Sequence, residues 1–292
     1  MLNEPRELMD AFRGTALEGL NVEIVPESDV LLVTWLDPKN LLAGWQAARD
    51  LMAVTGRRPV AAGEEFRDEF YEVEAAELQE LETAVHSLDP WPEKYALEAE
   101  LDRKYWSMDE VDLETVSQLL NFRGSGPAWD SDAVARELLP GIPAPTTDYT
   151  LNEHLLKHIC DAPERLAQLG PVDESETSSG ALDWYKATEV HLALLPTTSP
   201  WLSAAWLYYF GEDDTANLAA CMRQWNEAWG AEIVASWGTM LQFVTTRRPA
   251  FGPEAFELAR QHLAMAGNLH VPPLQLAWEL AHTNAWFLHE RP

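Results

Sequence analysis

Cysteine is scarce in this sequence, and long hydrophobic runs are absent from it. The two cysteines, Cys160 and Cys221, lie far apart and show no CxxC or zinc-type spacing, which argues against a disulfide framework and a structural zinc site. No segment approaches the roughly 20 apolar residues that a membrane-spanning helix needs. The amino terminus, MLNEPRELMDAFRG, is charged and lacks the hydrophobic core of a signal peptide. We therefore expect a cytoplasmic protein that does not bind membranes.

Basic residues are also few. The chain has 20 Lys and Arg against 48 Asp and Glu, a formal net charge of −28. Eighteen acids and four bases lie between Glu64 and Glu114, so half of the excess negative charge falls in this acidic segment. Such charge repels nucleic acid and anionic membranes and attracts a basic protein partner. The alternative is that the acids keep the chain soluble or reflect an acid-rich, salt-adapted proteome.

Motifs that would carry catalysis are missing. The sequence has no GxGxxG or GxxxxGK[ST] phosphate loop and no GxSxG nucleophile motif, so we predict no cofactor and no catalytic residue. The best metal candidate is NEHLLKH, in which His154 and His158 share one face of a helix. Glu153 precedes the first histidine instead of following it, and a third ligand is not evident. We therefore predict no metal.

The hydrophobic pattern predicts an α+β fold. Residues 21–36 are typical of two short strands that are interrupted at Pro26. Residues 37–56 predict a helix with Asp37 as its cap and Gly56 as its stop, and residues 58–62 predict a strand. This β–α–β unit indicates a mixed sheet with flanking helices.

An acidic helical insertion is predicted between this unit and the last third of the chain. Apolar residues recur at helical spacing within residues 64–88. The buried stripe of this helix would be Phe66, Phe70, Val73, Ala76 (or Glu77), Leu81 and Val85. Residues 91–107, 109–122 and 150–170 are also typical of helices, whereas glycine and proline in 124–148 predict mostly a loop. The predicted domains are 1–62, 63–170 and 171–292.

The last third predicts helices and strands again. Strands are expected at 188–196 and 285–290, and a β-hairpin at Gly238-Thr239. Helices are expected at 213–230, 252–268 and 272–283. The inward faces of two of these helices and of the hairpin predict one shared core, consisting of Trp225, Ile233, Val234, Leu241, Phe243, Phe256 and Leu263.

The stretch PWLSAAWLYYFG, from Pro200 to Gly211, predicts one further helix. Leu202, Ala205, Trp206 and Tyr209 fit one apolar stripe, so most of the stretch is expected to lie in the core. Trp201 is left near the rim of that stripe. An amphipathic aromatic residue in such a position can line a pocket or contact a partner.

Several motifs of the last third together resemble a known family. They are LALLPTTSPW, QWNEAWGAEIVASWGTMLQF, RRPAFGPEAFELARQHLAMAGN and AWFLHE. This set resembles the bacterial domain-of-unknown-function family numbered 4253, and GWQAARDLMAVTGRRPV is loosely similar to its upstream half. The loop FGEDDTAN departs from the family's Gly-Gly-x-Asn and Cys-Pro pattern. The resemblance implies a fold and no particular activity.

Two functions remain open from the sequence. The first is a non-enzymatic binding protein whose acidic surface contacts a basic partner, as in an immunity protein against a basic toxin domain or a mimic of nucleic-acid charge. Its expected contact residues are Glu65, Asp68, Glu69, Glu72 and Trp201. The alternative is an enzyme or small-ligand binder in the C-terminal α+β part. An enzyme would bring several of four residues into one cavity: His191, His262, His282 and Glu232.

Overall fold

A computed structural model describes residues 1–63, 72–122, 129–169, 187–269 and 271–291. The chain forms two compact units. Of the residues described, those within 1–90, 181–247 and 285–292 form unit 1, and those within 91–180 and 248–284 form unit 2. The acidic segment therefore contributes to both units.

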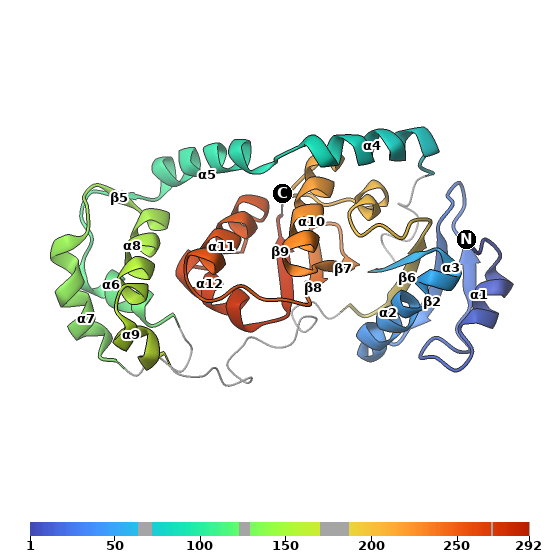
Figure 1. Cartoon of the computed structure of the whole chain (residues 1–292), viewed down its shortest axis with the longest axis horizontal. Helices are drawn as coiled ribbons and strands as arrows, with labels where there is room; N and C mark the ends of the chain where they lie inside the picture. Colours follow the sequence, from blue (N-terminus) through green and yellow to red (C-terminus); the bar gives the residue numbers. More distant parts are fainter. Residues whose placement is uncertain (64–71, 123–128, 170–186, 270, 292) are drawn as a thin grey trace. The chain divides into compact units, whose positions relative to one another are not determined.

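Seven strands of the described chain form one mixed sheet in unit 1 (Figure 1). They are β1 (Val22–Ile24), β2 (Leu31–Leu36), β3 (Arg58–Ala62), β6 (Val190–Leu195), β7 (Glu232–Ser236), β8 (Met240–Val244) and β9 (Ala285–His289), in the spatial order β1-β2-β6-β3-β7-β8-β9. The expected hairpin joins β7 and β8.

The β–α–β unit of the sequence is split by a third strand. β2 and β3 both pair with β6 in the antiparallel sense, so β6 lies between them. β3 then pairs with β7 in the parallel sense. Among the described strands of this sheet, this is the one parallel pair. Leu195 stands opposite Arg58, and His191 stands opposite Ala62, at the two ends of the β6–β3 ladder.

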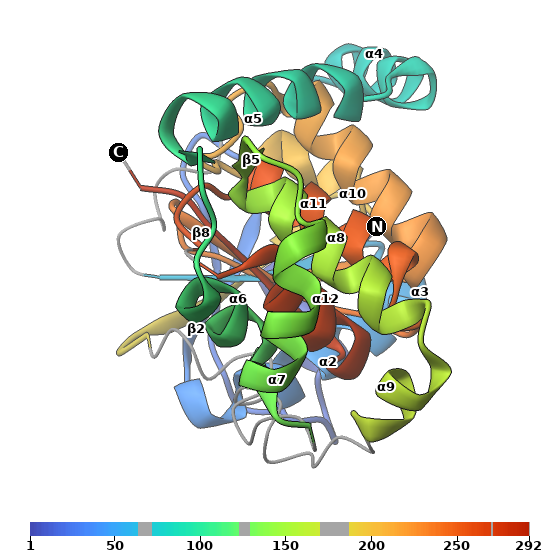
Figure 2. The same cartoon turned by 90° about the vertical axis from the view of Figure 1, so that its left-hand side faces the viewer.

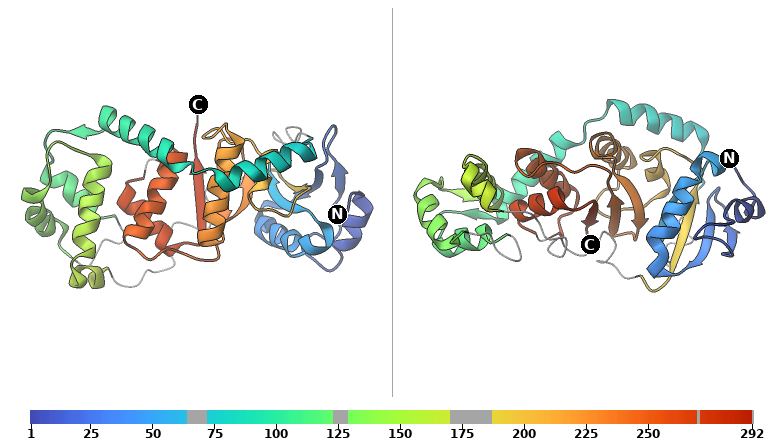
Figure 3. Two further views of the ribbon diagram at one scale, coloured as in Figure 1. Left: turned by 45° about the horizontal axis from the view of Figure 1, so that its top comes forward. Right: turned by 60° about the horizontal axis from the view of Figure 1, so that its bottom comes forward.

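Helices cover both faces of this sheet. They are α1 (Pro5–Ala11), the 3-10 helix η1 (Pro38–Asn40), α2 (Leu41–Asp50), α3 (Met52–Thr55), α4 (Ala75–Ser87), the 3-10 helix η4 (Leu202–Trp206) and α10 (Thr215–Trp229). α1 and α2 pack on one face, where Phe12 and Trp45 join alternate strand residues such as Leu192 and Leu194 in one apolar cluster. The right-hand view of Figure 3 shows α2 alongside the sheet.

α10 lies on the opposite face. Met240 and Val244 of β8 point to the α2 side, so Phe243 between them points to the other side. There the ring of Trp225 stands 5.8 Å from the ring of Phe243 and 6.0 Å from that of Trp286. α10 begins where Asp214 accepts hydrogen bonds from two backbone N–H groups, and it ends at Gly230 in the left-handed conformation, which agrees with the helix expected at 213–230.

Unit 2 is mainly helical. Its elements are α5 (Trp91–Tyr105), β4 (Ser107–Met108), α6 (Leu113–Leu120), α7 (Ser131–Leu138), the 3-10 helix η3 (Leu139–Gly141), β5 (Thr146–Thr147), α8 (Asp148–Cys160), α9 (Pro163–Gln168), α11 (Pro253–Met265) and α12 (Pro273–His282). α11 and α12 pack together, α8 packs on both, and α5 runs along α11 (Figure 2). β4 and β5 form a short antiparallel ribbon.

The structure confirms the α+β class with a mixed sheet and flanking helices, but several elements differ from the prediction. The expected helix from Pro200 to Gly211 is only η4. Residues after it bond to the β7–β8 hairpin instead: Phe210 N–H donates to Gly238 O at 3.0 Å, and Ser236 Oγ donates to Tyr208 O at 3.4 Å. These contacts hold the residues after η4 extended beside the turn of the β7–β8 hairpin. Trp206 and Tyr209 are nevertheless buried.

The region expected to be mostly loop contains α7 within its described part. Asp130 caps this helix by accepting from Ala133 N–H at 3.1 Å, and Ala135 and Leu138 are buried. Glycine and proline near the ends of α7 interrupt the helical spacing of its apolar residues, so the sequence pattern indicated a loop.

The helix expected over 64–88 also begins later than predicted. Residues 64–71, with Phe66 and Phe70 of the stripe, lie outside the described residues, and residues 72–74 are not helical. Glu74 and Glu77 form a reciprocal capping box that starts α4 at Ala75. Ala76 and Glu77 are exposed, whereas Val85 is buried.

The expected shared core is wrong for two residues. Trp225, Ile233, Val234, Leu241 and Phe243 are buried in unit 1. Phe256 and Leu263 lie on α11 in unit 2, and Leu263 is only partly buried. The segment Arg248–Asn284 folds with the middle of the chain, and this is not visible in local periodicity. No helix of the described residues is long and apolar enough to cross a membrane.

Candidate functional site

The predicted partner-binding residues are only partly described. Glu65, Asp68 and Glu69 lie outside the described residues, and Glu72 is exposed. Trp201 is half-buried at the start of η4. Its indole N–H donates to Glu82 of α4 at 2.8 Å, and its ring stands edge-on to His86 at 6.1 Å. The role of these five residues in binding stays a prediction.

α4 is fixed to unit 1 by polar contacts as well as by packing. Val85 is buried, and its backbone carbonyl accepts from Arg223 Nε of α10 at 3.2 Å. Glu82 holds Trp201 and also pairs with His86 at 3.2 Å. Because these contacts lie on one side of α4, its remaining carboxylates face water.

Many carboxylates of the acidic segment have no partner within the described chain. Their side chains are exposed and form no hydrogen bond or ion pair with a described residue; they are Glu72, Glu80, Glu93, Glu100, Asp109 and Glu110. Described carboxylates of the segment that do have a side-chain partner include Glu82, which meets His86, and Glu98, which meets Arg260 of α11 at 3.2 Å.

α5 carries exposed apolar side chains beside these acids. Leu97, Leu101 and Tyr105 repeat every four residues and are 59%, 44% and 61% exposed, and the adjacent Trp106 is 63% exposed. The other side of α5 faces α11, where the Tyr95 hydroxyl donates to Glu257. An exposed apolar stripe of this length on one helix is typical of an interaction surface.

Unit 1 also contains a buried charged cluster. Arg58 of β3 donates to Glu232 at 2.7 Å and Arg49 of α2 donates to it at 2.6 Å. Arg58 also donates to the carbonyl of Thr198 at 2.7 Å. Burial opposes the charge of Glu232, but the hydrogen bonds from Arg49 and Arg58 outweigh it, so the pKa of Glu232 lies below its ordinary value. The cluster joins α2, β3 and β7 and is structural.

The four residues of the enzyme alternative are divided between the two units, two in each. Glu232 binds Arg58 at one end of β3, whereas His191 stands at the other end of the same ladder, with its ring 5.4 Å from that of Trp35. His262 and His282 belong to unit 2, where each bonds through Nδ1 to the carbonyl four residues before it on its own helix. A catalytic role of these side chains stays a prediction.

The histidine pair of α8 lies as its spacing predicts. The rings of His154 and His158 are 5.4 Å apart on one face, and Glu153 is exposed. Burial, followed by the neighbouring His154, lowers the pKa of His158. Within the described ranges, no three His, Cys, Asp or Glu side chains form a group that could hold a metal ion.

His262 provides a test of the packing of unit 2. Burial lowers its pKa to about 4, against 6.5 for a free histidine. The neutral form therefore stabilises the fold above about pH 6.5, and this contribution is lost as the pH falls through the folded-state value. We expect the free energy of unfolding of the wild type to fall by about 1–3 kcal/mol as the pH is lowered over this range. His262→Gln should remove this fall. The exposed His86→Gln should leave the loss in place, and an unchanged profile in His262→Gln would contradict this burial.

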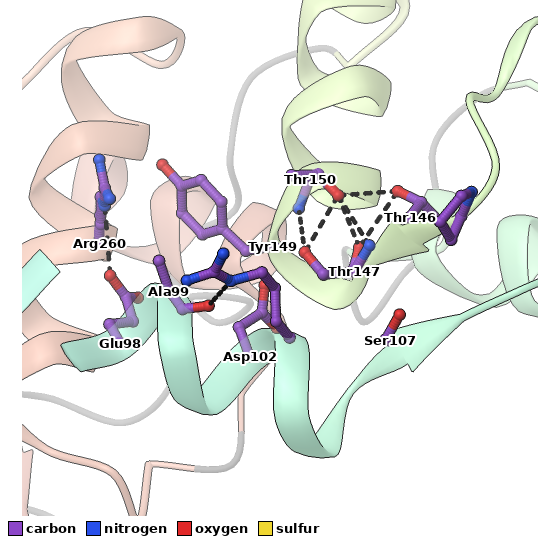
Figure 4. Close-up of a pocket in the computed structure, with 11 residues that line it drawn as sticks. Glu98, Ala99, Asp102, Ser107, Thr146, Thr147, Tyr149, Thr150 and Arg260 are labelled. Atoms are coloured by element: carbon purple, nitrogen blue, oxygen red, sulfur yellow. Dashed lines mark hydrogen bonds and ion pairs between the residues drawn. The ribbon is translucent and has the colours of Figure 1, made fainter. Parts of the chain in front are cut away.

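A polar cavity of unit 2 lies between α5, the β4–β5 ribbon, α8 and α11 (Figure 4). It has a volume of about 730 Å³ and is lined by Glu98, Ala99, Asp102, Arg103, Ser107, Pro145, Thr146, Thr147, Tyr149, Thr150 and Arg260. Thr146, Thr147 and Thr150 bond to one another at the start of α8. Figure 4 shows Arg260 and Tyr149 on one side of the cavity and these threonines on the other.

No motif in the sequence points to these cavity residues. A partial signal existed, because Glu98 and Asp102 stand one helical turn apart on α5. Arg260 is the one Lys or Arg in the sequence of α11. Nothing local indicated that α5 and α11, 162 residues apart at Glu98 and Arg260, would meet.

The sheet and helices described above define a protein of the α+β class. Residues 191–289, the C-terminal third, match the model of a family described as a domain of unknown function (DUF4253). The match runs from β6 to β9 and confirms the resemblance of that third, while the segment GWQAARDLMAVTGRRPV lies outside it. The chain matches no curated protein and no solved structure.

Proposed function

We propose that this protein is a non-enzymatic binding protein of the bacterial cytoplasm whose acidic segment contacts a basic protein partner. An immunity-type inhibitor of a basic toxin domain, or a mimic of nucleic-acid charge, would act in this way. The observation that carries the proposal is the set of exposed carboxylates in this segment that have no partner among the described residues. Like charges on one surface repel each other, and a basic partner would relieve this repulsion.

The exposed stripe on α5 supports a protein as the partner. Protein interfaces combine an apolar centre with a polar rim. Leu97, Leu101 and Tyr105 would supply apolar contact, and Glu93 and Glu100 on the same helix would supply charge at the rim. A small cation would be satisfied by the carboxylates alone and would leave these apolar side chains in water.

The test begins with a partner captured from the native host at low salt and identified by mass spectrometry. Association rates are then measured by stopped flow over a range of salt concentrations. Neutralising Glu65, Asp68, Glu69 and Glu72 together should slow association and flatten its salt dependence, because rim charges act mainly on encounter and are screened over about 8–10 Å. Folding should remain intact.

The matched control removes the same charge elsewhere. Glu4, Glu7, Glu164 and Asp213 are exposed and lie outside the acidic segment. Neutralising these four together should change the association rate much less. Equal effects of the two sets would show that only net charge affects the association rate. A wild-type association rate in the first variant would show that the acidic segment is only solvated and does not contact the partner. The binding site would then be sought around Trp201.

A further inference from the structure

Arg260 occupies a constrained position in the cavity of unit 2. Its Nε donates to Glu98 at 3.2 Å, and its guanidinium carbon lies 3.8 Å from the ring centre of Tyr95 and 5.1 Å from that of Tyr149. Its two terminal nitrogens make no hydrogen bond with a described residue. A planar guanidinium with an open edge is the group that binds a carboxylate through two parallel hydrogen bonds.

The cavity also holds an unpaired negative group. Asp102 lies one helical turn beyond Glu98 on α5, and its carboxylate forms no hydrogen bond or ion pair within the described chain. Side chains four residues apart on a helix stand roughly 5–6 Å from each other. The guanidinium of Arg260 and the free carboxylate of Asp102 therefore line one cavity, the first bonded to Glu98 and the second one helical turn from Glu98.

We propose that this cavity binds a small zwitterion, such as a free amino acid or a short unblocked peptide. The ligand carboxylate would take the open edge of Arg260, and the ligand ammonium would pair with Asp102. The volume of about 730 Å³ lies in the range of small-molecule sites. This inference is independent of the proposed protein partner.

Both signs of charge are needed in the ligand. A simple anion would meet repulsion from Asp102 and from the negative charge of the chain as a whole. A simple cation would meet Arg103 and Arg260. Burial raises the pKa of Glu98 to about 7 despite the opposing effect of Arg260, so near neutral pH Glu98 only partly compensates the guanidinium. This leaves Arg260 available to a second carboxylate.

The experiment uses the full chain and isothermal titration calorimetry near neutral pH. The probes are the twenty amino acids and a set of unblocked dipeptides. For any probe that binds, its N-acetylated and its amidated derivatives are then titrated. We expect each derivative to bind at least about tenfold more weakly, because acetylation removes the ammonium charge and amidation removes the carboxylate.

Variants separate the site from unspecific effects. Asp102→Asn should weaken binding of the parent probe by about tenfold and abolish the penalty of acetylation, and it breaks no contact of the fold. Arg260→Gln, which removes the cation, should abolish the penalty of amidation. Asp109→Asn, an exposed unpaired carboxylate outside the cavity, should bind as the wild type does. The proposal is overturned if no probe binds below about 1 mM, if the derivatives bind equally, or if Asp102→Asn has no effect.

Discussion

Replacing Trp225 with alanine is expected to lower the free energy of unfolding of unit 1 by about 3–5 kcal/mol, the range for truncating a large buried aromatic side chain. Trp225 is 1% exposed and contacts Phe243 and Trp286 edge-on. Its indole therefore joins α10 to two strands of the sheet, and the cavity left behind would lie where those elements meet. Urea unfolding followed by circular dichroism measures the loss.

Hydrogen exchange locates this loss in unit 1, because the chain has two compact units and a single transition cannot be assumed. Peptides from β8 and β9 should exchange faster in the variant. Trp106→Ala is the matched control, since that indole is 63% exposed. Its effect should stay within about 0.5 kcal/mol. If Trp225→Ala melts at the wild-type temperature, Trp225 is not a core residue and the packing of α10 on the sheet is wrong.

The charged cluster of unit 1 should give the second large effect. Glu232→Gln leaves Arg58, whose side chain is only 4% exposed, without a charged partner. We expect a loss of about 3 kcal/mol near neutral pH, as for removal of one partner from a buried ion pair. Because the folded-state pKa of Glu232 is lowered, its contribution is present above the ordinary value of 4.5 and is lost as the pH falls below it. The difference between variant and wild type should shrink in acid.

A double variant distinguishes loss of charge from loss of packing. Arg58→Met with Glu232→Leu removes both buried partners and leaves Arg49, which is 38% exposed and can be solvated. The double variant should be more stable than Glu232→Gln alone, because no uncompensated charge remains buried. If the two variants are equally destabilised, or if Glu232→Gln is as stable as the wild type, the cluster does not hold β3, β7 and α2 together.

The cavity of unit 2 could not be predicted from the sequence. Its ion pair joins Glu98 to Arg260 across 162 residues, and its threonines come from a third segment. The same holds for Glu232, which meets two arginines from α2 and β3. Such sites depend on which helices and strands become neighbours, and local spacing does not contain that information. The acidic segment was visible at once because composition alone reveals it.

The sequence by itself determined the elements with strong local signals. Asp214 and Gly230 bound α10, Gly56 ends α3, and the hairpin turns near Gly238, because capping and turn conformations depend on a few adjacent residues. Only the tertiary structure decided that β6 lies between β2 and β3 and that α11 and α12 leave the C-terminal third for unit 2. The physical reason is that strand order and helix pairing are selected by the burial of apolar faces over the whole chain. Residues far apart in the sequence contribute equally to that burial.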